Sequence, residues 1–126
     1  MGTRIMIVDD SLHSRLILRD LLMSHGFSVV GEASNGGQAI ELYEQINPDL
    51  VMVDARMPDM DGVCAIREIL HRNPEALTIV CAGSGEKTSV VEAMSAGAVD
   101  FCAKPYVPRR VVSTLRRALA GVASQH

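Results

Sequence analysis

Aromatic residues are scarce in this chain, which has no tryptophan, two tyrosines and two phenylalanines among 126 residues. So few rings leave little surface on which the bases of a single-stranded nucleic acid could stack. The net charge of −3 at pH 7 also provides no chain-wide positive field for a nucleic-acid backbone. The composition therefore argues against nucleic acid as the partner.

Cysteines and long apolar runs are scarce as well. The three cysteines, Cys64, Cys81 and Cys102, are odd in number and are not spaced like metal ligands. We interpret them as reduced, mostly buried residues of a cytoplasmic protein. No apolar run reaches the length of a membrane span, and no signal peptide precedes the first apolar segment, so we do not expect membrane insertion.

Apolar residues, in contrast, make up 48% of the sequence, enough for one domain with a real core. Short apolar runs alternate five times with segments of helical character. The runs span residues 4–8, 27–33, 50–54, 77–81 and 99–103, and the helical segments after them end near residues 25, 46, 72, 96 and 120. This alternation predicts an α/β domain, with a core at about 4–120, in which parallel strands have helices on both faces.

Apolar residues mark every helical segment, the first and the fourth among them, and such stripes are expected to face the sheet. The stripes of these two segments are Leu12, Leu16, Ile17 and Leu21 in the first helix, and Val90, Val91 and Met94 in the fourth. We expect the last helix to span residues 107–120. Residues 121–126 are expected to be a frayed tail or the start of a linker.

Acidic residues directly follow or end two of the predicted strands. Asp54 ends the run at 50–54, and Asp9 and Asp10 follow the run at 4–8. The carboxyl ends of parallel strands meet at one edge of an open sheet, where binding sites lie. If these strands are neighbours, the three carboxylates repel one another, and a divalent cation with oxygen ligands, Mg²⁺ or Mn²⁺, would offset that repulsion.

Lys104 follows the run at 99–103 and would bring a positive charge to the same edge. Metal and ammonium together could stabilise a phosphoryl group during transfer to Asp54 as the nucleophile. The backbone carbonyl of Arg56 is a further candidate ligand. Each residue alone has a plainer interpretation, as a helix cap, a turn residue or a surface lysine. The chemical prediction therefore depends on the joint arrangement.

These motifs together resemble the receiver domain of two-component response regulators. The similarity rests on Asp9-Asp10, Asp54, residues 57–62 (Met-Pro-Asp-Met-Asp-Gly), Ala96-Gly97-Ala98 and Lys104-Pro105. It covers nearly the whole chain, so residues 1–126 are expected to form a single receiver domain. Residues 26–33 and 79–81 resemble in particular the stand-alone chemotaxis receivers of the CheY type. The resemblance implies a flavodoxin-like, doubly wound fold with five parallel strands in the order 2-1-3-4-5.

The resemblance also implies a phosphorylation-dependent switch. Asp54 would accept a phosphoryl group from a histidine on a sensor kinase or phosphotransfer protein, and Lys104 would pair with a phosphoryl oxygen. Asp9, Asp10, Asp54 and the Arg56 carbonyl would hold Mg²⁺, and the Lys104–Pro105 peptide bond is expected to be cis. Phe101 occupies the place of the family's rotating aromatic switch. A downstream protein would dock on the face formed by the fourth helix, the strand at 99–103 and the last helix, without enzymatic turnover.

One position departs from the family pattern. The threonine or serine usual at the end of the fourth strand falls on Ala82, which has no hydroxyl to bind the phosphoryl group. Phosphorylation should survive, because the acids and the lysine are present, but the coupling to Phe101 loses a contact. Ser84 could substitute if its glycine-flanked loop shifts. Arg56 is expected to alter autodephosphorylation, with slowing slightly favoured.

Three alternative functions stay open on the sequence alone. The chain could be the receiver of a larger DNA-binding or enzymatic regulator, or a constitutive binding module because of Ala82. It could also be a metal-dependent phosphohydrolase, although such enzymes usually carry a general acid where this chain has Arg56. The last helix bears Arg109, Arg110, Arg116 and Arg117, which we interpret as a protein-docking or solvated face rather than a nucleic-acid site.

Overall fold

The computed structural model describes residues 2–57 and 60–124, so Pro58 and Asp59 of the 57–62 motif lie outside the described residues. Five parallel strands form one sheet in the order β2-β1-β3-β4-β5, which confirms the predicted topology. The strands are β1 (Arg4–Val8), β2 (Ser28–Ala33), β3 (Leu50–Asp54), β4 (Thr78–Ala82) and β5 (Asp100–Ala103). The helices are α1 (Leu12–Ser24), α2 (Gly36–Ile46), α3 (Gly62–Arg72), α4 (Lys87–Ala96) and α5 (Pro108–Ser124).

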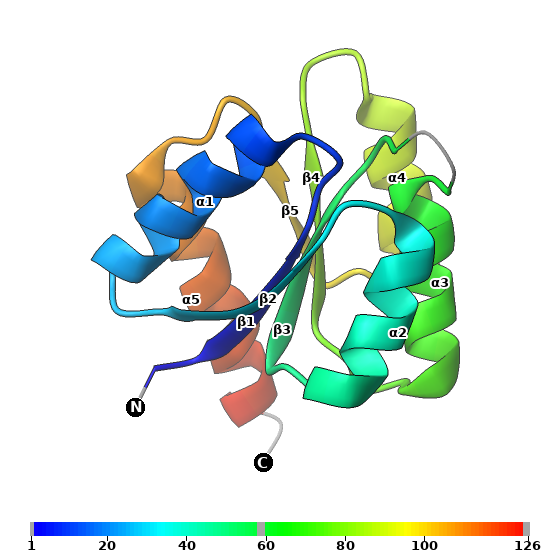
Figure 1. Cartoon of the computed structure of the whole chain (residues 1–126), viewed down its shortest axis with the longest axis horizontal. Coiled ribbons are helices and arrows are strands. Elements are labelled where there is room, and N and C mark those ends of the chain that lie inside the picture. The colour runs from blue at the N-terminus through cyan, green and yellow to red at the C-terminus, as the bar shows by residue number, and fades with distance from the viewer. Residues whose placement is uncertain (1, 58–59, 125–126) are drawn as a thin grey trace.

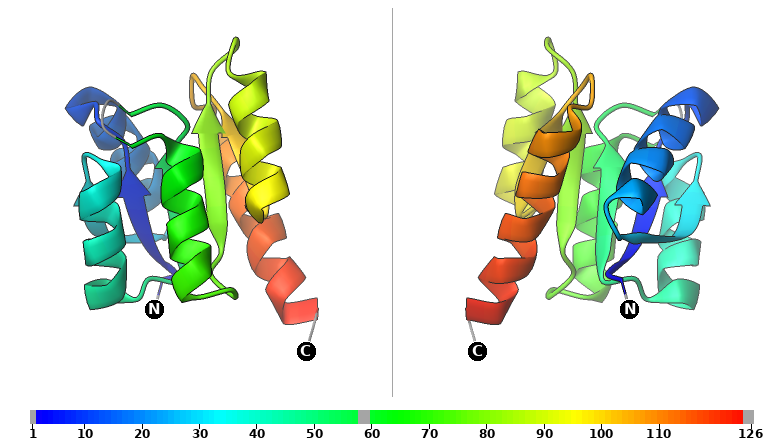
Figure 2. Two further views of the ribbon diagram at one scale, coloured as in Figure 1. Left: turned by 90° about the vertical axis from the view of Figure 1, so that its right-hand side faces the viewer. Right: turned by 90° about the vertical axis from the view of Figure 1, so that its left-hand side faces the viewer.

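The helices cover both faces of the sheet. Helices α1 and α5 lie on one face, and α2, α3 and α4 lie on the other (Figure 1). In Figure 2, α2, α3 and α4 lie in front of the strands in the left view, and α1 and α5 lie in front of them in the right view. The connections from strand to helix gather at one edge of the sheet, the upper edge in Figure 1. A doubly wound sheet of this kind places the carboxyl ends of its strands at that edge.

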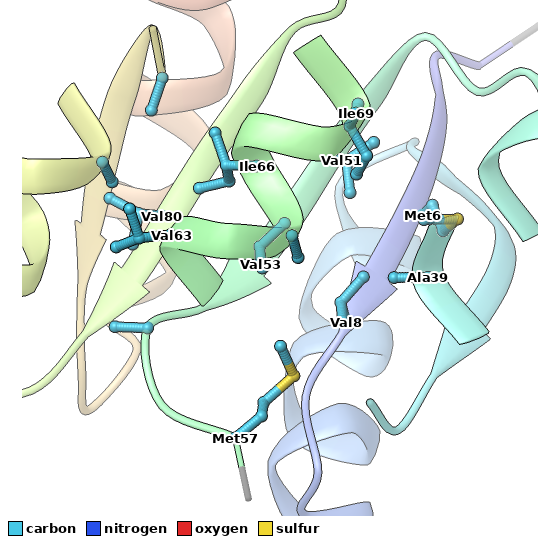
Figure 3. Close-up of a cluster of buried hydrophobic side chains, with 14 of the residues drawn as sticks. Met6, Val8, Ala39, Val51, Val53, Met57, Val63, Ile66, Ile69 and Val80 are labelled. Carbon is cyan, nitrogen blue, oxygen red and sulfur yellow. The ribbon is translucent and has the colours of Figure 1, made fainter. Parts of the chain in front are cut away.

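Two apolar clusters form the core, one on each face of the sheet. The central strands β3 and β4 contribute to both, because all their residues are buried and successive side chains point to opposite faces. Figure 3 shows the cluster under α2, α3 and α4, which includes Met6, Val8, Ala39, Val51, Val53, Met57, Val63, Ile66, Ile69 and Val80. The cluster under α1 and α5 includes Ile5, Ile7, Leu50, Met52, Ile79, Leu18, Leu22 and Leu115.

The buried face of α1 differs from the predicted one. Leu21 is buried as predicted, but the other three residues of the predicted stripe are exposed. The exposed residues are Leu12, Leu16 and Ile17, and the buried residues of α1 are Leu18, Leu21 and Leu22. Helix α1 therefore presents apolar side chains to solvent near its N-terminus, close to Asp10.

A polar network accompanies this orientation of α1. Arg15 Nε pairs with Glu32 Oε1 of β2 at 3.2 Å, and an Arg15 guanidinium nitrogen donates to the backbone carbonyl of Asp9 at 2.6 Å. Leu18 and Leu22 follow Arg15 by three and seven residues, so they share its face. The apolar spacing of α1 is compatible with two overlapping stripes. The buried stripe is Leu18, Leu21 and Leu22, and the ion pair between Arg15 and Glu32 lies on the same side of the helix.

Helix α4 also differs from its predicted packing. Its buried residue is Ala93, whereas Val91 is 64% exposed and Met94 is 40% exposed. Val90 is half-buried and packs against the core. The small side chain of Ala93 lets α4 approach the neighbouring α3 and β4 closely, which turns the larger side chains outward. An apolar surface results beside Phe101 of β5, whose side chain is 46% exposed.

The last helix is longer than predicted. Helix α5 continues through Gly121 to Ser124, so part of the expected tail is helical. The residues after Ala120 include no proline, and a single glycine is tolerated in a helix at a cost of about 1 kcal/mol relative to alanine. In the part of the chain that the structure describes, no helix combines the length and the apolar character needed to cross a bilayer.

The N-terminus of α2 provides a first prediction. Asn35 caps this helix, because its side-chain oxygen accepts a hydrogen bond from Gln38 N at 2.8 Å, and Gln38 Oε1 in turn accepts from Ser34 N at 3.0 Å. Replacing Asn35 by alanine is expected to lower the free energy of unfolding by about 1 kcal/mol. Chemical denaturation measures this change. Asn35→Asp, which keeps the acceptor, should stay close to wild type; equal losses in both variants would contradict a capping role.

Candidate functional site

The candidate site lies at the carboxyl ends of β1 and β3, which are adjacent strands. Val8 pairs with Val53 in the sheet register, so the residues that follow, Asp9 and Asp54, arrive side by side. Oxygen atoms of Asp9, Asp10 and Asp54 all lie within 4.8 Å of one another. Asp9 and Asp54 are buried, whereas Asp10 is exposed. The structure thus confirms the predicted meeting of the three acids.

Backbone contacts hold Asp9 in place. Its Oδ1 accepts from Ser11 N at 2.9 Å, and its own N–H donates to Ala33 O of β2 at 3.0 Å. Arg15 donates to its carbonyl oxygen, as described above. These contacts use both ends of the peptide unit and one carboxylate oxygen. The second oxygen, Oδ2, is directed at Lys104.

Lys104 reaches the acids from the end of β5. Its Nζ lies 3.1 Å from Asp9 Oδ2 and 2.9 Å from Asp54 Oδ1. The lysine is anchored by its own N–H, which donates to Ala82 O at 2.9 Å, and its peptide bond to Pro105 is cis as predicted. The Tyr106 ring lies below the ammonium, 5.9 Å from Nζ to the ring centroid. One cation therefore contacts two buried carboxylates.

Burial and nearby charges shift the pKa values of Asp54 and Lys104. Burial raises the pKa of Asp54 from 3.8 to about 6, opposed by the hydrogen bond from Lys104 and supported by the nearby charges of Asp9 and Glu86. Burial lowers the pKa of Lys104, but its hydrogen bond and charge interaction with Asp54 outweigh this, so the net shift is upward. At neutral pH the site therefore holds an ammonium between carboxylates, and the carboxylate at Asp54 is incompletely stabilised.

The raised pKa of Asp54 gives a pH prediction for the metal-free protein. The native state holds the Asp54 proton more tightly than the unfolded chain does. The resulting stability is fully present below about pH 4 and is lost as the pH rises through about 6. We expect a loss of about 2 kcal/mol across this window, after allowance for solvent screening at the mouth of the pocket. Chemical denaturation with a chelator at several pH values measures it.

The control for this titration is Asp54→Asn, which cannot ionise. Other carboxylates contribute to the pH dependence of both proteins, so the informative quantity is the difference between the two denaturation curves. That difference should widen between pH 4 and 6 and then level off. Parallel pH profiles for the two proteins would show that Asp54 has an ordinary pKa.

The donor set fits a hard divalent cation. Three carboxylates offer only oxygen ligands at close range, the chemistry that Mg²⁺ and Mn²⁺ prefer, and a buried pair of acids with one lysine leaves negative charge uncompensated. Asp10 is the exposed member and would be the ligand open to solvent. The Arg56 carbonyl stays a predicted ligand, because the contacts of Arg56 in the structure are those of its side chain.

Gly62 is the last residue of the 57–62 motif, and the structure gives it a positioning role that the sequence did not assign. A Cβ atom at Gly62 would lie only 2.1 Å from the backbone oxygen of Asp54, and the Gly62 N–H donates to Ala55 O at 3.0 Å. The helix α3 that begins here is capped by Asp61, whose Oδ1 accepts from Cys64 N at 2.8 Å. The missing side chain lets α3 start against the end of β3 and fixes the loop that carries Asp54.

The loop after β4 contains the other unanticipated group. Ala82 is buried at the end of β4, and Glu86 closes the loop that follows it. Glu86 Oε1 accepts from Gly83 N at 2.8 Å, and Glu86 Oε2 pairs with Arg56 Nε at 3.2 Å. An acid four residues beyond a strand gives no sequence signal of its own. Only the folded structure shows that Glu86 pairs with Arg56, which follows Asp54 by two residues.

The remaining predicted switch residue, Phe101, is 46% exposed and is not part of the acid cluster. Its side chain is exposed beside Val91 and Lys87, and with Ala82 and Lys104 these residues line one hollow between α4 and β5. Cys81 and Cys102 are buried neighbours on β4 and β5, as predicted for core cysteines, and Cys64 is exposed. The structure therefore brings Asp9, Asp10, Asp54 and Lys104 together and leaves Phe101 outside the pocket.

Sequence comparison relates the chain to bacterial signalling proteins. A family model described as the response regulator receiver domain matches residues 5–116. The chain is similar to the chemotaxis protein CheY of Thermotoga maritima, with 45% identity over 117 residues that cover 93% of this chain and 98% of that protein. It is 43% identical to the chemotaxis protein CheY of Bacillus subtilis over 119 residues, covering 94% and 99% of the two chains.

A related protein of known structure shares the fold of this chain. A crystal structure of a CheX–CheY complex with BeF₃ and Mg²⁺ from Borrelia burgdorferi contains a chain that superposes with a TM-score of 0.87 at 28% identity. The match covers 93% of this chain and 89% of that chain. The similarity therefore extends over the strands, the helices and the edge of the sheet at which the acids meet.

Proposed function

This chain belongs to the response regulator receiver family, and from that premise we propose that Asp54 is its phosphoryl acceptor. It is a phosphorylation-dependent response regulator of the chemotaxis type. The observation that supports Asp54 most strongly is the contact of Lys104 Nζ with its Oδ1 at 2.9 Å, beside the oxygen atoms of Asp9 and Asp10. Asp9 is also buried, contacts Lys104 and belongs to the acid cluster, but its Oδ1 accepts a hydrogen bond from Ser11 N at 2.9 Å and its Oδ2 faces Lys104, so both of its oxygens are engaged.

The proposed reaction is a direct transfer. An Asp54 carboxylate oxygen attacks the phosphorus of a phosphohistidine, the P–N bond breaks, and the imidazole nitrogen leaves with the bonding electron pair and is then protonated. Lys104 Nζ stabilises charge on the phosphoryl oxygens and orients the Asp54 carboxylate. Asp9 and Asp10 would hold Mg²⁺, which when bound supplies further charge neutralisation for the phosphoryl group.

Steady enzymatic turnover is not part of the proposal. A phosphohydrolase that uses an aspartyl phosphate needs a general acid near the leaving group, and the residue two positions after Asp54 is Arg56, which does not release a proton near neutral pH. The Arg56 side chain is instead engaged with Glu86. We expect a single transfer to Asp54 followed by slow loss of the phosphoryl group to water.

The phosphoryl donor is expected to approach over α1. Asp10 is exposed at the start of this helix, and the apolar side chains of Leu12 and Leu16 are exposed directly after it. A histidine-bearing protein that docks on these leucines would bring its phosphohistidine to the open side of the acidic pocket. Apolar contacts would provide affinity while the acids and Lys104 perform the chemistry.

The downstream target is expected on the opposite part of the surface. Val91 and Met94 of α4 and Phe101 of β5 form an exposed apolar area, next to a groove of about 390 Å³ lined by β5 and the arginines of α5. Arg109 and Arg110 line this groove, so an acidic, partly apolar protein segment is the complementary partner. The relative in the solved CheX–CheY complex shows that a CheY protein assembles with another protein.

Intact mass measurement tests the proposed acceptor. The protein is incubated with Mg²⁺ and acetyl phosphate, beside Asp54→Asn as the matched control of nearly equal size. One added phosphoryl group is expected on the wild type and none on the variant. Because rapid hydrolysis would hide the adduct, beryllofluoride binding followed by amide chemical shifts provides the second measurement. The absence of both signals on the wild type, or an equal adduct on Asp54→Asn, would rule out Asp54 as the acceptor.

A further inference from the structure

The end of β4 lacks the hydroxyl group that would otherwise sense a phosphoryl group. Ala82 is 4% exposed and its methyl side chain cannot donate a hydrogen bond. Its carbonyl oxygen is already occupied by the N–H of Lys104. A phosphorylation signal that is to reach α4 therefore requires another group that changes partner when charge appears on Asp54.

The Arg56–Glu86 ion pair lies where such a group is needed. Arg56 follows Asp54 by two residues in the loop after β3, and Glu86 is the residue that directly precedes α4. The pair thus connects the loop that carries the acceptor with the first turn of the helix that borders the target surface. Glu86 is 17% exposed at its side chain whereas Arg56 is 74% exposed, so Arg56 is the partner with freedom to move.

Glu86 also restrains its own loop. Its second carboxylate oxygen accepts from Gly83 N at 2.8 Å, and its N–H donates to Gly83 O at 3.2 Å. Glu86 occupies the N-cap position of α4, yet its side chain makes no capping hydrogen bond to that helix. The first turn of α4 therefore has no side-chain cap while the loop holds the carboxylate.

Phosphorylation changes the balance of this ion pair. A phosphoryl group adds about two negative charges and three strong acceptor oxygens at Asp54. An arginine guanidinium can bind phosphate oxygens with two parallel hydrogen bonds, which is stronger and more directional than its single contact with a carboxylate. The same charge repels Glu86, which already interacts unfavourably with a charged Asp54. Both effects favour transfer of Arg56 from Glu86 to the phosphoryl group.

We propose that the Arg56–Glu86 ion pair is the phosphorylation sensor of this chain, in which a phosphoryl group on Asp54 takes Arg56 from Glu86 and releases the first turn of α4. The released carboxylate of Glu86 then becomes available to the unpaired N–H groups of that turn, where an acid is stabilised by the helix dipole. The sensor replaces the contact that Ala82 cannot make. Arg56 is thereby a positioning residue for the phosphoryl group and Glu86 a positioning residue for α4.

This inference rests on the proposed function, so its test separates occupancy of Asp54 from the response of α4. Amide chemical shifts are recorded with Mg²⁺ and beryllofluoride as a stable phosphoryl mimic. The Ala55 amide reports occupancy, because it follows Asp54 directly. The amides of Gly83 and Thr88 report the sensor, since one is bonded to Glu86 and the other lies in the first turn of α4. In the wild type all three amides are expected to shift.

Arg56→Gln is the decisive variant. Arg56 is highly exposed, so its replacement leaves the fold intact. The Ala55 shift should persist in this variant, whereas the Gly83 and Thr88 shifts should be lost. Arg67→Gln, at an exposed position on α3, is the matched control and should behave as the wild type. Adding Ala82→Thr to Arg56→Gln supplies the missing hydroxyl and should restore the Thr88 shift.

A further variant tests the second residue of the ion pair, Glu86. Glu86→Ala removes both the partner of Arg56 and the carboxylate that would cap the first turn of α4, so the Ala55 shift should persist in this variant while the Thr88 shift is lost. Unchanged Gly83 and Thr88 shifts in Arg56→Gln would overturn the sensor and leave Asp54 as the acceptor. An Ala55 shift without any α4 response in the wild type would overturn it as well. No shift at all in the wild type, together with no phosphoryl adduct, would reject the proposed function and the sensor together.

Discussion

Replacing Lys104 by alanine is expected to slow phosphorylation by acetyl phosphate about 100-fold, because one preorganised cation at the developing phosphoryl charge is removed. The same change should lower the free energy of unfolding of the metal-free protein at pH 8 by about 2 kcal/mol. The reason is that Nζ lies 3.1 Å from Asp9 Oδ2 and 2.9 Å from Asp54 Oδ1, so its removal leaves two buried carboxylates without a counter-charge. Intact mass over time and chemical denaturation measure the two effects.

The Lys104 prediction has an internal check in Mg²⁺. A divalent cation can replace the lost positive charge in the stability measurement, so added Mg²⁺ should recover more stability in Lys104→Ala than in the wild type. Lys87→Ala is the matched control, because Lys87 is exposed and is the chain's only other lysine. A loss of stability that Mg²⁺ does not reduce, or an equal loss in the Lys87 variant, would contradict a charge-compensating role for Lys104.

Gly62→Ala is expected to lower the free energy of unfolding by about 3 kcal/mol, at the upper end of the usual range for forcing an atom into a packed site. The added Cβ would lie 2.1 Å from Asp54 O, and the obstructing atom is backbone, which cannot rotate away as a flexible side chain can. Either α3 or the end of β3 must move. Because Asp54 is the last residue of β3, the rate of phosphorylation should fall with the stability.

Gly37→Ala is the matched control for this clash. A Cβ at Gly37 would meet only Asn35 Oδ1, at an ordinary contact distance of 3.5 Å, and the residue lies in the first turn of α2. That variant should be neutral or slightly more stable, since alanine has the higher helix propensity. A Gly62 variant with wild-type stability and phosphorylation would show that the start of α3 adapts without strain.

The architecture was predictable because its signals are local and repeated. Each strand is a short apolar run, each helix follows within a few residues, and parallel strands joined by helices have few alternative arrangements. Asp9, Asp10, Asp54 and Lys104 were predictable for the same reason: each lies at or next to a strand end, and the topology brings strand ends together. The strand order, in contrast, came from the family resemblance.

The predictions that failed concern which side of a helix faces the sheet. In α1 the apolar residues form more than one helical stripe, and the structure buries Leu18 and Leu22 rather than Leu12 and Leu16. In α4 the small Ala93, and no large apolar residue, is fully buried. Helical spacing shows how residues group together, but long-range polar contacts and close helix packing determine which group is buried.

The roles of Gly62 and Glu86 at the site were not predicted for a different physical reason. Gly62 matters for the volume that it does not fill, and Glu86 matters through an ion pair with a residue 30 positions earlier in the chain. Steric room and contacts between two loops are properties of the assembled fold. Gly62 belongs to the 57–62 motif, but the motif does not show which atoms lie next to the glycine. Glu86 carried no sequence signal.

Helix α4 has the weakest local anchoring of the helices that cover its face of the sheet. It has one fully buried residue, no side-chain cap, and a valine and a methionine that face solvent, whereas α3 buries five residues and is capped by Asp61. Local opening of α4 is therefore expected to require less free energy than opening of α3, and its amide hydrogens are expected to exchange with solvent sooner. A protein that docks on the proposed target surface would therefore have to order α4 at a cost in conformational entropy, and in return could reshape this helix more easily than its neighbours.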